Sequence, residues 1–508
     1  MTQINRLSAN YDTVTSRIDR NKRITFRFNN KNYSGFHGDT IASALLANDV
    51  KVIGRSFKYG RPRGIVSAGS DEPNAILQLG KTEQTQVPNV RATQQLIFEG
   101  LECFSTNCWP STNRDLKGVI GKLFGHFLPP GFYYKTFMAP RSLWMSYEKL
   151  IRKGAGLGKS PTKPDPDIYD VLNQNTDILI IGAGPAGLAA ALSAAPSGAR
   201  IIIADEQNEF GGNLLGRKDL INGASAQHWI DESVAKLHSF NNVSLLINAT
   251  VNGYHDHNFL TIHERLTDHS HDLAPTNKVR QRLHRVRAKQ VILATGAHER
   301  PLVFANNDIP GCMLASAVST YINRYQVLPG KSLLLMTNND NAYLTAFDWK
   351  MQCKELTNKT VTIVDTRQKS GETVSQRAAE LGIQVISASA IIEAKGSQLV
   401  KGAIVASLNL AGDKVVGGER QIECDTVATS GGWSPAVHLS CHTGGRPLWR
   451  EEIQGFIPDN FNKNMIATGA CNGLYPLADI LENATEVGLE SVRKSAIKID
   501  NIKALIKT

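Results

Sequence analysis

The sequence is poor in cysteine and contains no CxxC pair. Its seven cysteines are an odd number without the spacing of a disulfide scaffold, and they stand at positions 103, 108, 312, 353, 424, 441 and 471. Disulfide-stabilised folds are therefore excluded, and a reducing, cytoplasmic compartment is predicted. Cys103 and Cys108 lack the second pair or nearby histidine that a zinc site needs, so we interpret them as structural thiols.

A secretory signal and an uninterrupted membrane span are also missing. The N-terminal residues contain no apolar core of the kind that a signal peptide needs. The longest apolar stretch, residues 178–195, is interrupted by glycines, which predict a strand, a turn and a helix instead of a transmembrane helix. No membrane partner is expected.

The sequence has no stripe of basic residues, although its net charge is +10. Lysines and arginines are scattered, and no predicted helix interleaves them with aromatics as a nucleic-acid-binding surface would. The densest basic run, residues 278–290, leads directly into an apolar strand and is interpreted as a solvated segment or a subunit contact. No nucleic-acid partner is predicted.

The order of elements near the N-terminus predicts a small β-grasp domain. Residues 22–34 alternate between apolar and polar side chains, which is typical of a hairpin. Residues 39–50 place apolar side chains on one helical face behind a capping residue, Asp39 or Thr40. A further strand is expected at residues 75–80.

A loop in this domain keeps the spacing of an iron–sulfur site without its ligands. Plant-type [2Fe–2S] loops have the pattern C-x4-C-x2-C, and residues 61–76 contain the same frame. Its three positions hold Ser67, Glu72 and Ala75, none of which carries sulfur. We therefore expect a ferredoxin-like domain with no iron–sulfur cluster, kept for packing.

A glycine motif between two predicted strands points to a dinucleotide. Gly182, Gly184 and Gly187 form G-x-G-x-x-G after a strand and at the start of a helix. These glycines allow a tight turn, let a pyrophosphate approach backbone N–H groups, and let helix and strand pack closely. Asp205 or Glu206 ends the next strand and is expected to accept hydrogen bonds from ribose hydroxyls, which favours NAD or FAD over NADP.

The same strand–helix–strand plan recurs at residues 331–365 with a different loop. No glycine stands between Leu335 and Gly371, and the loop contains Asp340. Side chains obstruct close backbone approach there, and a carboxylate repels phosphate. We predict that this second nucleotide site is lost and that one dinucleotide is bound.

The late segment favours NAD over FAD. Two-domain flavoprotein reductases usually carry Gly-Asp at this place, the Asp holding the flavin ribityl chain, whereas this sequence has Gly469-Ala470-Cys471.

Alternating strands and helices predict an α/β fold class with two dinucleotide-binding domains, like that of the pyridine nucleotide-disulfide oxidoreductases. The predicted domains are a ferredoxin-like β-grasp domain (1–110), an aromatic, Pro- and Gly-rich connection (111–172), a dinucleotide-binding domain (173–330 and 420–508) and an inserted Rossmann-like domain with a degenerate nucleotide loop (331–419).

Several residues resemble catalytic or metal-binding groups, but no catalytic and no metal-binding residue is predicted. Five histidines, at 255, 257, 263, 269 and 271, fit a polar hairpin. His298, Glu299 and Arg300 follow a strand end at an expected crevice, where either an acid–base role or internal pairing is consistent with the pattern. Cys312 has no resolving partner and is assigned to the core.

Long strings of the sequence closely resemble the α subunit of bacterial heterotetrameric sarcosine oxidase, in order from about residue 20 to residue 490. They include GDTIASALLANDVKVIGRSFKYGRPRGIVSAGSDEPNA, PPGFYYKTFMAP, ATGAHERPLVFANNDIPGCMLASA, TNNDNAY and SGGWSPAVHL. The resemblance implies a complex in which a β subunit carries FAD and oxidises an N-methyl amine. Electrons pass to FMN between α and β and then to oxygen, which gives peroxide.

The resemblance also implies an NAD+ on the α subunit with no obvious part in the redox chemistry, and small γ and δ subunits as further partners. The implied NAD+ contacts are Ala186, Asp205, Glu206, Gln207, Asn213, Val251, Ala470, Tyr475 and Leu477. Family α subunits continue into a folate-binding domain, whereas this sequence stops at Thr508, so a different amine or a separate folate-binding chain is expected. Two alternatives stay open, an FAD-binding α subunit of an opine or amine dehydrogenase complex and a non-catalytic NAD-binding scaffold.

Overall fold

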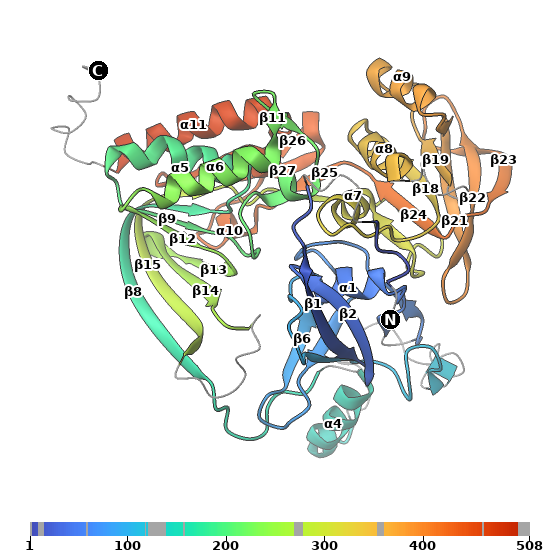
Figure 1. Cartoon of the computed structure of the whole chain (residues 1–508), viewed down its shortest axis with the longest axis horizontal. Helices are drawn as coiled ribbons and strands as arrows, with labels where there is room; N and C mark the ends of the chain where they lie inside the picture. Colours follow the sequence, from blue (N-terminus) through green and yellow to red (C-terminus); the bar gives the residue numbers. More distant parts are fainter. Residues whose placement is uncertain are drawn as a thin grey trace. The chain divides into compact units, whose positions relative to one another are not determined.

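The computed structural model describes residues 3–8, 15–56, 59–116, 118–119, 139–155, 158–268, 278–352, 360–459 and 462–495 (Figure 1). The chain divides into a first unit, Met1–Pro166 with Pro301–Gly432, and a second unit, Asp167–Arg300 with Trp433–Thr508. The four-part division expected from the sequence remains a prediction.

The N-terminal part of the first unit is a mixed sheet with one helix. The sheet has the order β2-β1-β7-β5-β6, in which β1 and β7 are parallel and the other pairs antiparallel. Its elements are β1 (Asp19–Phe28), β2 (Lys31–His37), α1 (Ile41–Ala47), β5 (Ile76–Leu79), β6 (Val87–Arg91) and β7 (Glu102–Ser105). The predicted hairpin, helix and following strand are thus confirmed. Thr40 is the N-cap of α1, since its hydroxyl accepts from Ser43 N while the Ser43 hydroxyl accepts from Thr40 N.

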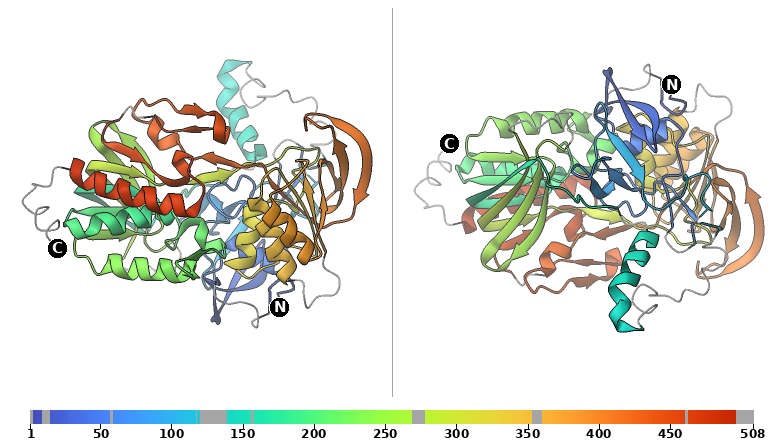
Figure 2. Two further views of the ribbon diagram at one scale, coloured as in Figure 1. Left: turned by 90° about the horizontal axis from the view of Figure 1, so that it is seen from above. Right: turned by 90° about the horizontal axis from the view of Figure 1, so that it is seen from below.

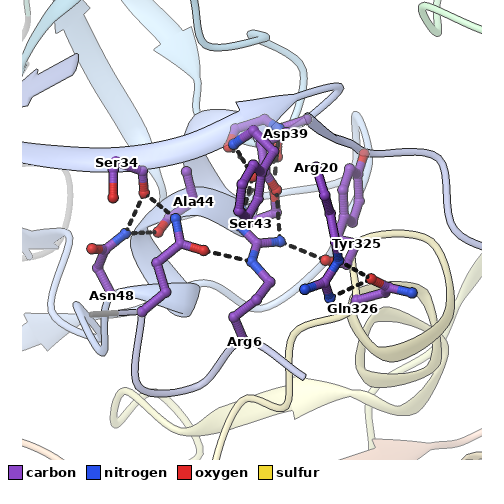
Figure 3. Close-up of polar contacts among 12 residues, drawn as sticks. Arg6, Arg20, Ser34, Asp39, Ser43, Ala44, Asn48, Tyr325 and Gln326 are labelled. Carbon is purple, nitrogen blue, oxygen red and sulfur yellow. Dashed lines mark hydrogen bonds and ion pairs between the residues drawn. The ribbon is translucent and has the colours of Figure 1, made fainter. Parts of the chain in front are cut away.

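Asp39 has a different task, which is to bind the N-terminal segment (Figure 3). Arg6 donates to both carboxylate oxygens of Asp39, at 2.6 and 3.2 Å, and to the carbonyl of Tyr325 at 2.5 Å. The Arg6 and Asp39 side chains are 4% and 0% exposed. Ser43 Oγ and Phe36 N also donate to Asp39. Such a buried pair is tolerable because hydrogen bonds compensate its desolvation. It joins residues 3–8 to α1 and to the segment after α7 (Ala315–Asn323).

The remainder of the first unit is a parallel sheet of order β17-β24-β18-β19-β20 with an antiparallel sheet of order β21-β22-β23. A single hydrophobic core joins this part to the N-terminal sheet and includes Phe26, Leu45 and Trp349. The predicted strand–helix–strand repeat is confirmed as β18, α8 and β19. The elements are β17 (Cys312–Leu314), α7 (Ala315–Asn323), β18 (Ser332–Thr337), α8 (Asn341–Gln352), β19 (Thr360–Asp365), α9 (Glu372–Glu380), β20 (Gln384–Ile386), β21 (Ser389–Gly396), β22 (Val400–Leu408), β23 (Val415–Ile422) and β24 (Thr426–Ser430).

The second unit is built on a larger sheet of order β12-β9-β8-β15-β14-β13, with β28 also pairing with β15. β12, β9, β8, β15 and β28 run parallel, whereas β14 and β13 are antiparallel additions. The helices α5, α6 and α11 lie side by side over one face (Figures 1 and 2) and share an apolar core with it. The elements are β8 (Ile168–Ile181), α5 (Pro185–Ala194), β9 (Ile201–Ala204), α6 (Ala226–His238), β12 (Val243–Leu246), β13 (Ala249–His255), β14 (Phe259–Arg265), β15 (Val279–Leu293), β28 (Met465–Ala467) and α11 (Leu477–Lys494).

Two stretches singled out in the sequence have their structures here. The apolar stretch 178–195 is the end of β8, a turn and α5, as predicted, and among the described residues no helix is long and apolar enough to span a membrane. The basic run 278–290 does not precede a strand but is most of β15 itself. Arg280 pairs with Asp167 and Asp268, and Arg282 with Asp170, so neighbouring strand ends neutralise these charges. Alternate side chains of β15 point to opposite faces of the sheet. The number of charges in the run does not show this alternation.

Candidate dinucleotide-binding site

The G-x-G-x-x-G residues form a compact turn between β8 and α5, which we call the glycine loop (residues 182–187). Gly182 has φ +95°, and a Cβ atom there would lie 2.3 Å from the carbonyl oxygen of Ala294. A Cβ atom at Gly187 would lie 1.9 Å from the carbonyl oxygen of Gly182, so neither glycine tolerates a side chain. At Gly184 the nearest atom to a Cβ would be 3.7 Å away. The loop therefore combines tight strand–helix contacts at Gly182 and Gly187 with an ordinary contact at Gly184, the position at which a pyrophosphate approaches the backbone in such loops.

The N-terminus of α5 begins at Gly184. Gly184 is the N-cap and makes no side-chain capping hydrogen bond, and Pro185 follows at the first helical position. The first turn contains no acidic residue, while Ala186 and Gly187 lie in it. The first N–H groups of a helix have no intrahelical acceptor and carry the positive end of its dipole. This end of α5 consequently fits an anionic ligand.

Asp205 and Glu206, which sequence reasoning left as alternatives, have different environments. Asp205 is 7% exposed, and its Oδ2 accepts from Ala183 N at 2.7 Å while Oδ1 accepts from Gln207 N at 2.8 Å. Asp205 therefore holds the glycine loop onto the end of β9. Glu206 is less buried. Of the two acids, Glu206 is the better candidate to accept hydrogen bonds from ribose hydroxyls.

Three more of the predicted contacts follow β9 or lie on β13. Backbone bonds from Asn248 N to Gln207 O (2.8 Å) and from Ala249 N to Asp205 O (2.7 Å) fix the start of β13, which carries Val251, beside the end of β9. Asn213 lies in a 3-10 turn, Gly212–Gly216, directly after a glycine pair. A Cβ atom at Gly212 would lie 2.8 Å from the Cα of Gly184. This second close approach of backbones was not predicted, although the adjacent glycines were its visible signal.

The late predicted contacts lie in the turn Gly469–Asn472 and at the start of α11. A Cβ atom at Gly469 would lie 2.7 Å from the Cβ of Ala186, so the turn that holds Ala470 packs against the first turn of α5. Tyr475 donates through its hydroxyl to the carbonyl of Trp433 at 3.4 Å, and burial raises its pKa. Leu477 is the first residue of α11 and packs on the apolar core of the second unit.

Two side chains from distant segments lie near Glu206, Arg265 and His438. Arg265 at the end of β14 donates through Nη2 to the Glu206 carbonyl at 3.4 Å. His438, in α10 (His438–Cys441), stacks on His298 with ring centres 6.4 Å apart and planes 8° apart. Burial lowers the His438 pKa, His298 and His442 lower it further, and the Glu206 charge opposes them. Sequence reasoning missed Arg265 and His438, since nothing in their spacing connects them to the glycine motif.

The His298-Glu299-Arg300 triplet lies in β16 (Ala297–Glu299) and just after it, where β16 pairs with β25 (Trp433–Pro435). Arg300 donates to the carbonyl of Trp433 at 3.1 Å and to that of Ile453 at 3.0 Å. These two bonds hold the Arg300 guanidinium against β25 and the turn that ends at Ile453. Glu299 is buried.

The histidine-rich segment forms the β13–β14 hairpin, as predicted, and carries His255, His257 and His263. His269 and His271 lie outside the described residues. Within the described ranges, no group of three or more His, Cys, Asp or Glu side chains is arranged to hold a metal ion. Cys312 and Cys103 are buried, as expected of core thiols, and burial raises the pKa of both.

The corresponding loop of the first unit, which we call the asparagine loop (residues 338–341), is filled by side chains. Arg367 donates to Asp340 Oδ1 at 2.7 Å and to Asp365 Oδ2 at 2.8 Å, and Gly371 N donates to Asp340 Oδ1 at 3.2 Å. Asp365, at the end of β19, is fully buried and also accepts from the Tyr343 hydroxyl at 2.8 Å. The Tyr343 and Arg367 side chains, with the backbone N–H of Arg367, thus satisfy the acid at the strand end.

The loop with the frame of an iron–sulfur site is organised by Glu72. Its Oε2 accepts from Val66 N and Ser67 N, both at 2.8 Å, and its Oε1 from Asn74 N at 2.8 Å and Ala75 N at 2.9 Å. Burial raises the Glu72 pKa, and these four backbone bonds oppose the effect. The hydroxyl, carboxylate and methyl at the three frame positions do not fit the thiolate ligands of a [2Fe–2S] cluster.

Two families match parts of the chain. The family described as "2Fe-2S iron-sulfur cluster binding domain" matches residues 21–107, and "Pyridine nucleotide-disulphide oxidoreductase" matches residues 176–492. The first match contradicts our prediction that the cofactors exclude an iron–sulfur cluster, and that prediction is wrong. It was drawn from three positions of one loop, whereas the match covers the whole β-grasp domain of the iron–sulfur class. The second match covers more than half of the chain and agrees with the predicted fold class.

Individual proteins are also similar to this chain in sequence or in fold. The α subunit of sarcosine oxidase from Rhizobium meliloti (strain 1021) is 39% identical over 494 residues, which are 95% of this chain and 48% of that protein. An opine oxidase subunit from Agrobacterium tumefaciens (strain Ach5) is 28% identical over 56% of this chain and 57% of that protein. The crystal structure of L-proline dehydrogenase from P. horikoshii has the same fold, with a TM-score of 0.61, 17% identity, and coverage of 97% of this chain and 78% of that one. The chain spans about half the length of the sarcosine oxidase subunits it matches. It belongs to the pyridine nucleotide-disulphide oxidoreductase family, and the resemblance of its sequence to sarcosine oxidase α subunits is confirmed.

Proposed function

We propose that the chain is the NAD-binding α subunit of a sarcosine oxidase-like complex. The complex oxidatively demethylates sarcosine or a related N-methyl or secondary amine, with FAD on a β subunit, FMN at the α/β interface and O2 as the acceptor. The observation that carries the proposal is the 39% identity to a sarcosine oxidase α subunit over 95% of this chain. Small γ and δ subunits complete the proposed assembly.

In this proposal the chain's own residues bind and orient a dinucleotide. The backbone at Gly184 and the N-terminus of α5, which has no side-chain cap, receive the pyrophosphate. Asp205 holds the glycine loop in place, and Glu206 accepts hydrogen bonds from a ribose. A bound nicotinamide dinucleotide supplies hydride-transfer chemistry when it takes part in a reaction. Oxidation of the amine is assigned to the flavin-binding partner, since we assign no catalytic residue to this chain.

A second candidate has a specific observation in its favour. The opine oxidase subunit from Agrobacterium tumefaciens matches part of the chain at 28% identity. In this candidate the glycine loop holds FAD, and electrons go from an opine or other amine to a carrier. Ala470 stands against it, because the residue after Gly469 carries no carboxylate for a flavin ribityl chain.

The test uses the full chain, alone and coexpressed with a flavin-binding β partner. The isolated chain is denatured with acid, and the released ligand is identified by mass. Release of NAD+ together with sarcosine-dependent O2 consumption and peroxide formation by the coexpressed complex is the expected result. A flavin absorbance spectrum and release of FAD from the isolated chain would instead favour the opine-type candidate. A complex that consumes no O2 with sarcosine or other N-methyl amines would refute the proposed activity.

A further inference from the structure

We propose that one face of the strands β8, β15 and β14 is a docking surface for a protein partner that presents carboxylates. These strands lie side by side in the sheet of the second unit (Figure 1). We call this face the outer face, and it consists of the side chains at the odd positions of 169–175 on β8, 281–287 on β15 and 259–265 on β14. The partner is a subunit of the proposed complex, so the inference rests on the proposed function and adds the surface by which the chain joins that complex.

The alternation of side chains separates the outer face from a buried one. Successive side chains of a strand point to opposite faces of the sheet. The even positions include Leu260, Ile262 and Val286, which are all 0% exposed. Every side chain of the outer face is at least partly exposed, and Tyr169 and Val171 are 49% and 51% exposed. The sheet therefore buries one face in the apolar core and leaves the outer face accessible.

The charges of these strands are divided unequally between the two faces. On the even side, Arg282 has Asp170 and Glu264 as its cross-strand neighbours and donates to both carboxylate oxygens of Asp170, at 2.9 and 3.0 Å. No position of the outer face holds an aspartate or a glutamate. The carboxylates of this part of the sheet consequently lie on the face opposite to the outer one.

Arg285 and Arg287, which we call the arginine pair, are exposed on the outer face. Each has an asparagine as its neighbour on β8, and their neighbours on β14 are Thr261 and Phe259. Within the part of the chain that the structure describes, neither guanidinium forms an ion pair. The Arg287 guanidinium carbon lies 5.2 Å from the centre of the Phe259 ring, which orders the side chain without neutralising its charge.

The composition of the outer face is that of a protein interface. The cores of such interfaces are enriched in aromatic residues and arginine and depleted in lysine and acids, and buried arginines and tyrosines there carry much of the binding energy. The outer face has no lysine, and Tyr169 lies near the apolar cross-strand pair Val171 and Leu283. A single-stranded nucleic acid would need ring faces for base stacking, whereas Arg287 already covers one face of Phe259.

The arginine pair defines the chemistry of the partner. Residues two apart on a strand point to the same face about 7 Å apart. A guanidinium presents a planar fork of donors that suits a carboxylate, and such charge-assisted pairs are stronger than neutral hydrogen bonds. The matching surface of the partner therefore carries two carboxylates with this spacing, as alternate residues of a strand do, beside apolar side chains that cover Val171 and Leu283.

The test uses the full chain coexpressed with the flavin-binding and small partner subunits. Native mass spectrometry identifies the subunits in the purified complex, and a dilution series measures their dissociation. Arg285→Glu with Arg287→Glu should weaken the binding of one subunit at least about 100-fold, because like charges then face each other. Arg285→Gln with Arg287→Gln removes the attraction without adding repulsion and should weaken it about tenfold. Lys401→Glu with Arg420→Glu, at two exposed cations on β22 and β23, should leave assembly unchanged.

The outcomes separate this inference from the proposed function. If the wild-type chain forms no complex, both are overturned. If the glutamate variant retains every subunit at wild-type affinity, the inference alone is overturned. If it loses a subunit while the wild-type complex oxidises no amine, the docking surface stands and the proposed activity fails.

A second measurement excludes a nucleic-acid surface. If the wild-type chain binds a single-stranded oligonucleotide in fluorescence anisotropy and the glutamine variant assembles normally but no longer binds it, the inference is overturned. Melting temperatures of the isolated chains serve as the folding control. If the glutamate variant melts earlier than the wild type, the glutamine variant decides the outcome, since it adds no charge to the sheet.

Discussion

The chain contains two strand–loop–helix–strand segments of one topology, β8–α5–β9 in the second unit and β18–α8–β19 in the first. Both end in an aspartate that accepts a backbone hydrogen bond from two residues further on. Gln207 N donates to Asp205 Oδ1 at 2.8 Å, and Arg367 N donates to Asp365 Oδ1 at 2.9 Å. The two segments therefore share the local structure of the strand end, and the aspartate there is part of the fold in both.

The two segments differ in the group that donates a hydrogen bond to the other carboxylate oxygen of this aspartate. In the glycine loop that partner is a backbone group, Ala183 N. In the asparagine loop the partners are the Tyr343 hydroxyl and the Arg367 guanidinium, which also binds Asp340. A loop stabilised by its backbone leaves room for a ligand, whereas a loop stabilised by side chains is occupied by them.

The largest expected effect is that of Gly187→Ala. A Cβ atom 1.9 Å from the Gly182 carbonyl oxygen forces backbone apart at the contact of β8 with α5, and we expect a loss of about 3 kcal/mol or more in unfolding free energy. Thermal melting of the purified chain measures it. The matched variant in the other segment is Ala342→Gly, in the first turn of α8, with an expected cost of about 1 kcal/mol. Equal losses in the two variants would contradict the comparison.

Arg367→Met is expected to have the next largest effect. It leaves Asp365, which is fully buried, without its cation, and a buried charge stripped of its partner costs about 3 kcal/mol. The melting temperature should fall while the dinucleotide content of the chain stays unchanged. Arg377→Met, which breaks an exposed pair on α9, should cost less than about 1 kcal/mol. Loss of bound dinucleotide in Arg367→Met would show that the asparagine loop has kept a nucleotide-binding role.

Gly184→Ala separates ligand binding from folding. The nearest atom to the new Cβ is 3.7 Å away, so the fold accepts the methyl group and the melting temperature without ligand should stay the same. The methyl group occupies the space at which a pyrophosphate approaches the backbone, and we expect NAD+ affinity to fall about tenfold or more. Asp340→Gly, which empties the asparagine loop instead, should leave one dinucleotide per chain. Unchanged NAD+ affinity in Gly184→Ala would place the ligand elsewhere.

Local patterns made much of the fold predictable. The β-grasp order, the glycine loop and the α8 segment all follow from periodicity, capping residues and glycines that act within about ten residues. The choice of Thr40 over Asp39 as the cap was not predictable, because Asp39 is drawn away by Arg6, a residue on another segment. The basic run was predicted to precede a strand, because the number of charges does not show that Arg280 and Arg282 pair with aspartates next to and on β8.

Only the part of the candidate site that lies in the glycine motif was predictable from the sequence. Asp205 and Glu206 look equivalent in the sequence, and the backbone N–H groups of Ala183 and Gln207 distinguish them only in three dimensions. Arg265 and His438 reach the site through sheet pairing and a late helix, so no spacing rule includes them. The prediction that no iron–sulfur cluster is bound was wrong because a spacing rule for one loop was applied to a whole domain.

The smallest expected effect is a difference in pH dependence between the surroundings of Glu206 and the asparagine loop. Burial, His298 and His442 lower the His438 pKa, so the unfolded state binds more protons than the folded state near the usual histidine pKa of about 6.5. Stability should therefore fall as pH decreases from about 7 toward the folded pKa, and His438→Gln should flatten this part of the profile.

The asparagine loop should respond only in stronger acid. Burial alone would raise the Asp340 pKa, but the Arg367 hydrogen bond and the Gly371 amide hold it below its usual value. The stabilisation that ionised Asp340 gives the folded state is consequently complete above about pH 4 and is lost as pH falls through the folded pKa. Asp340→Asn should therefore change the dependence of stability on pH only below about pH 4. Thermal melting between about pH 3 and pH 8 separates the two transitions. A His438→Gln profile parallel to that of the wild type would contradict a contribution of His438 to the pH dependence.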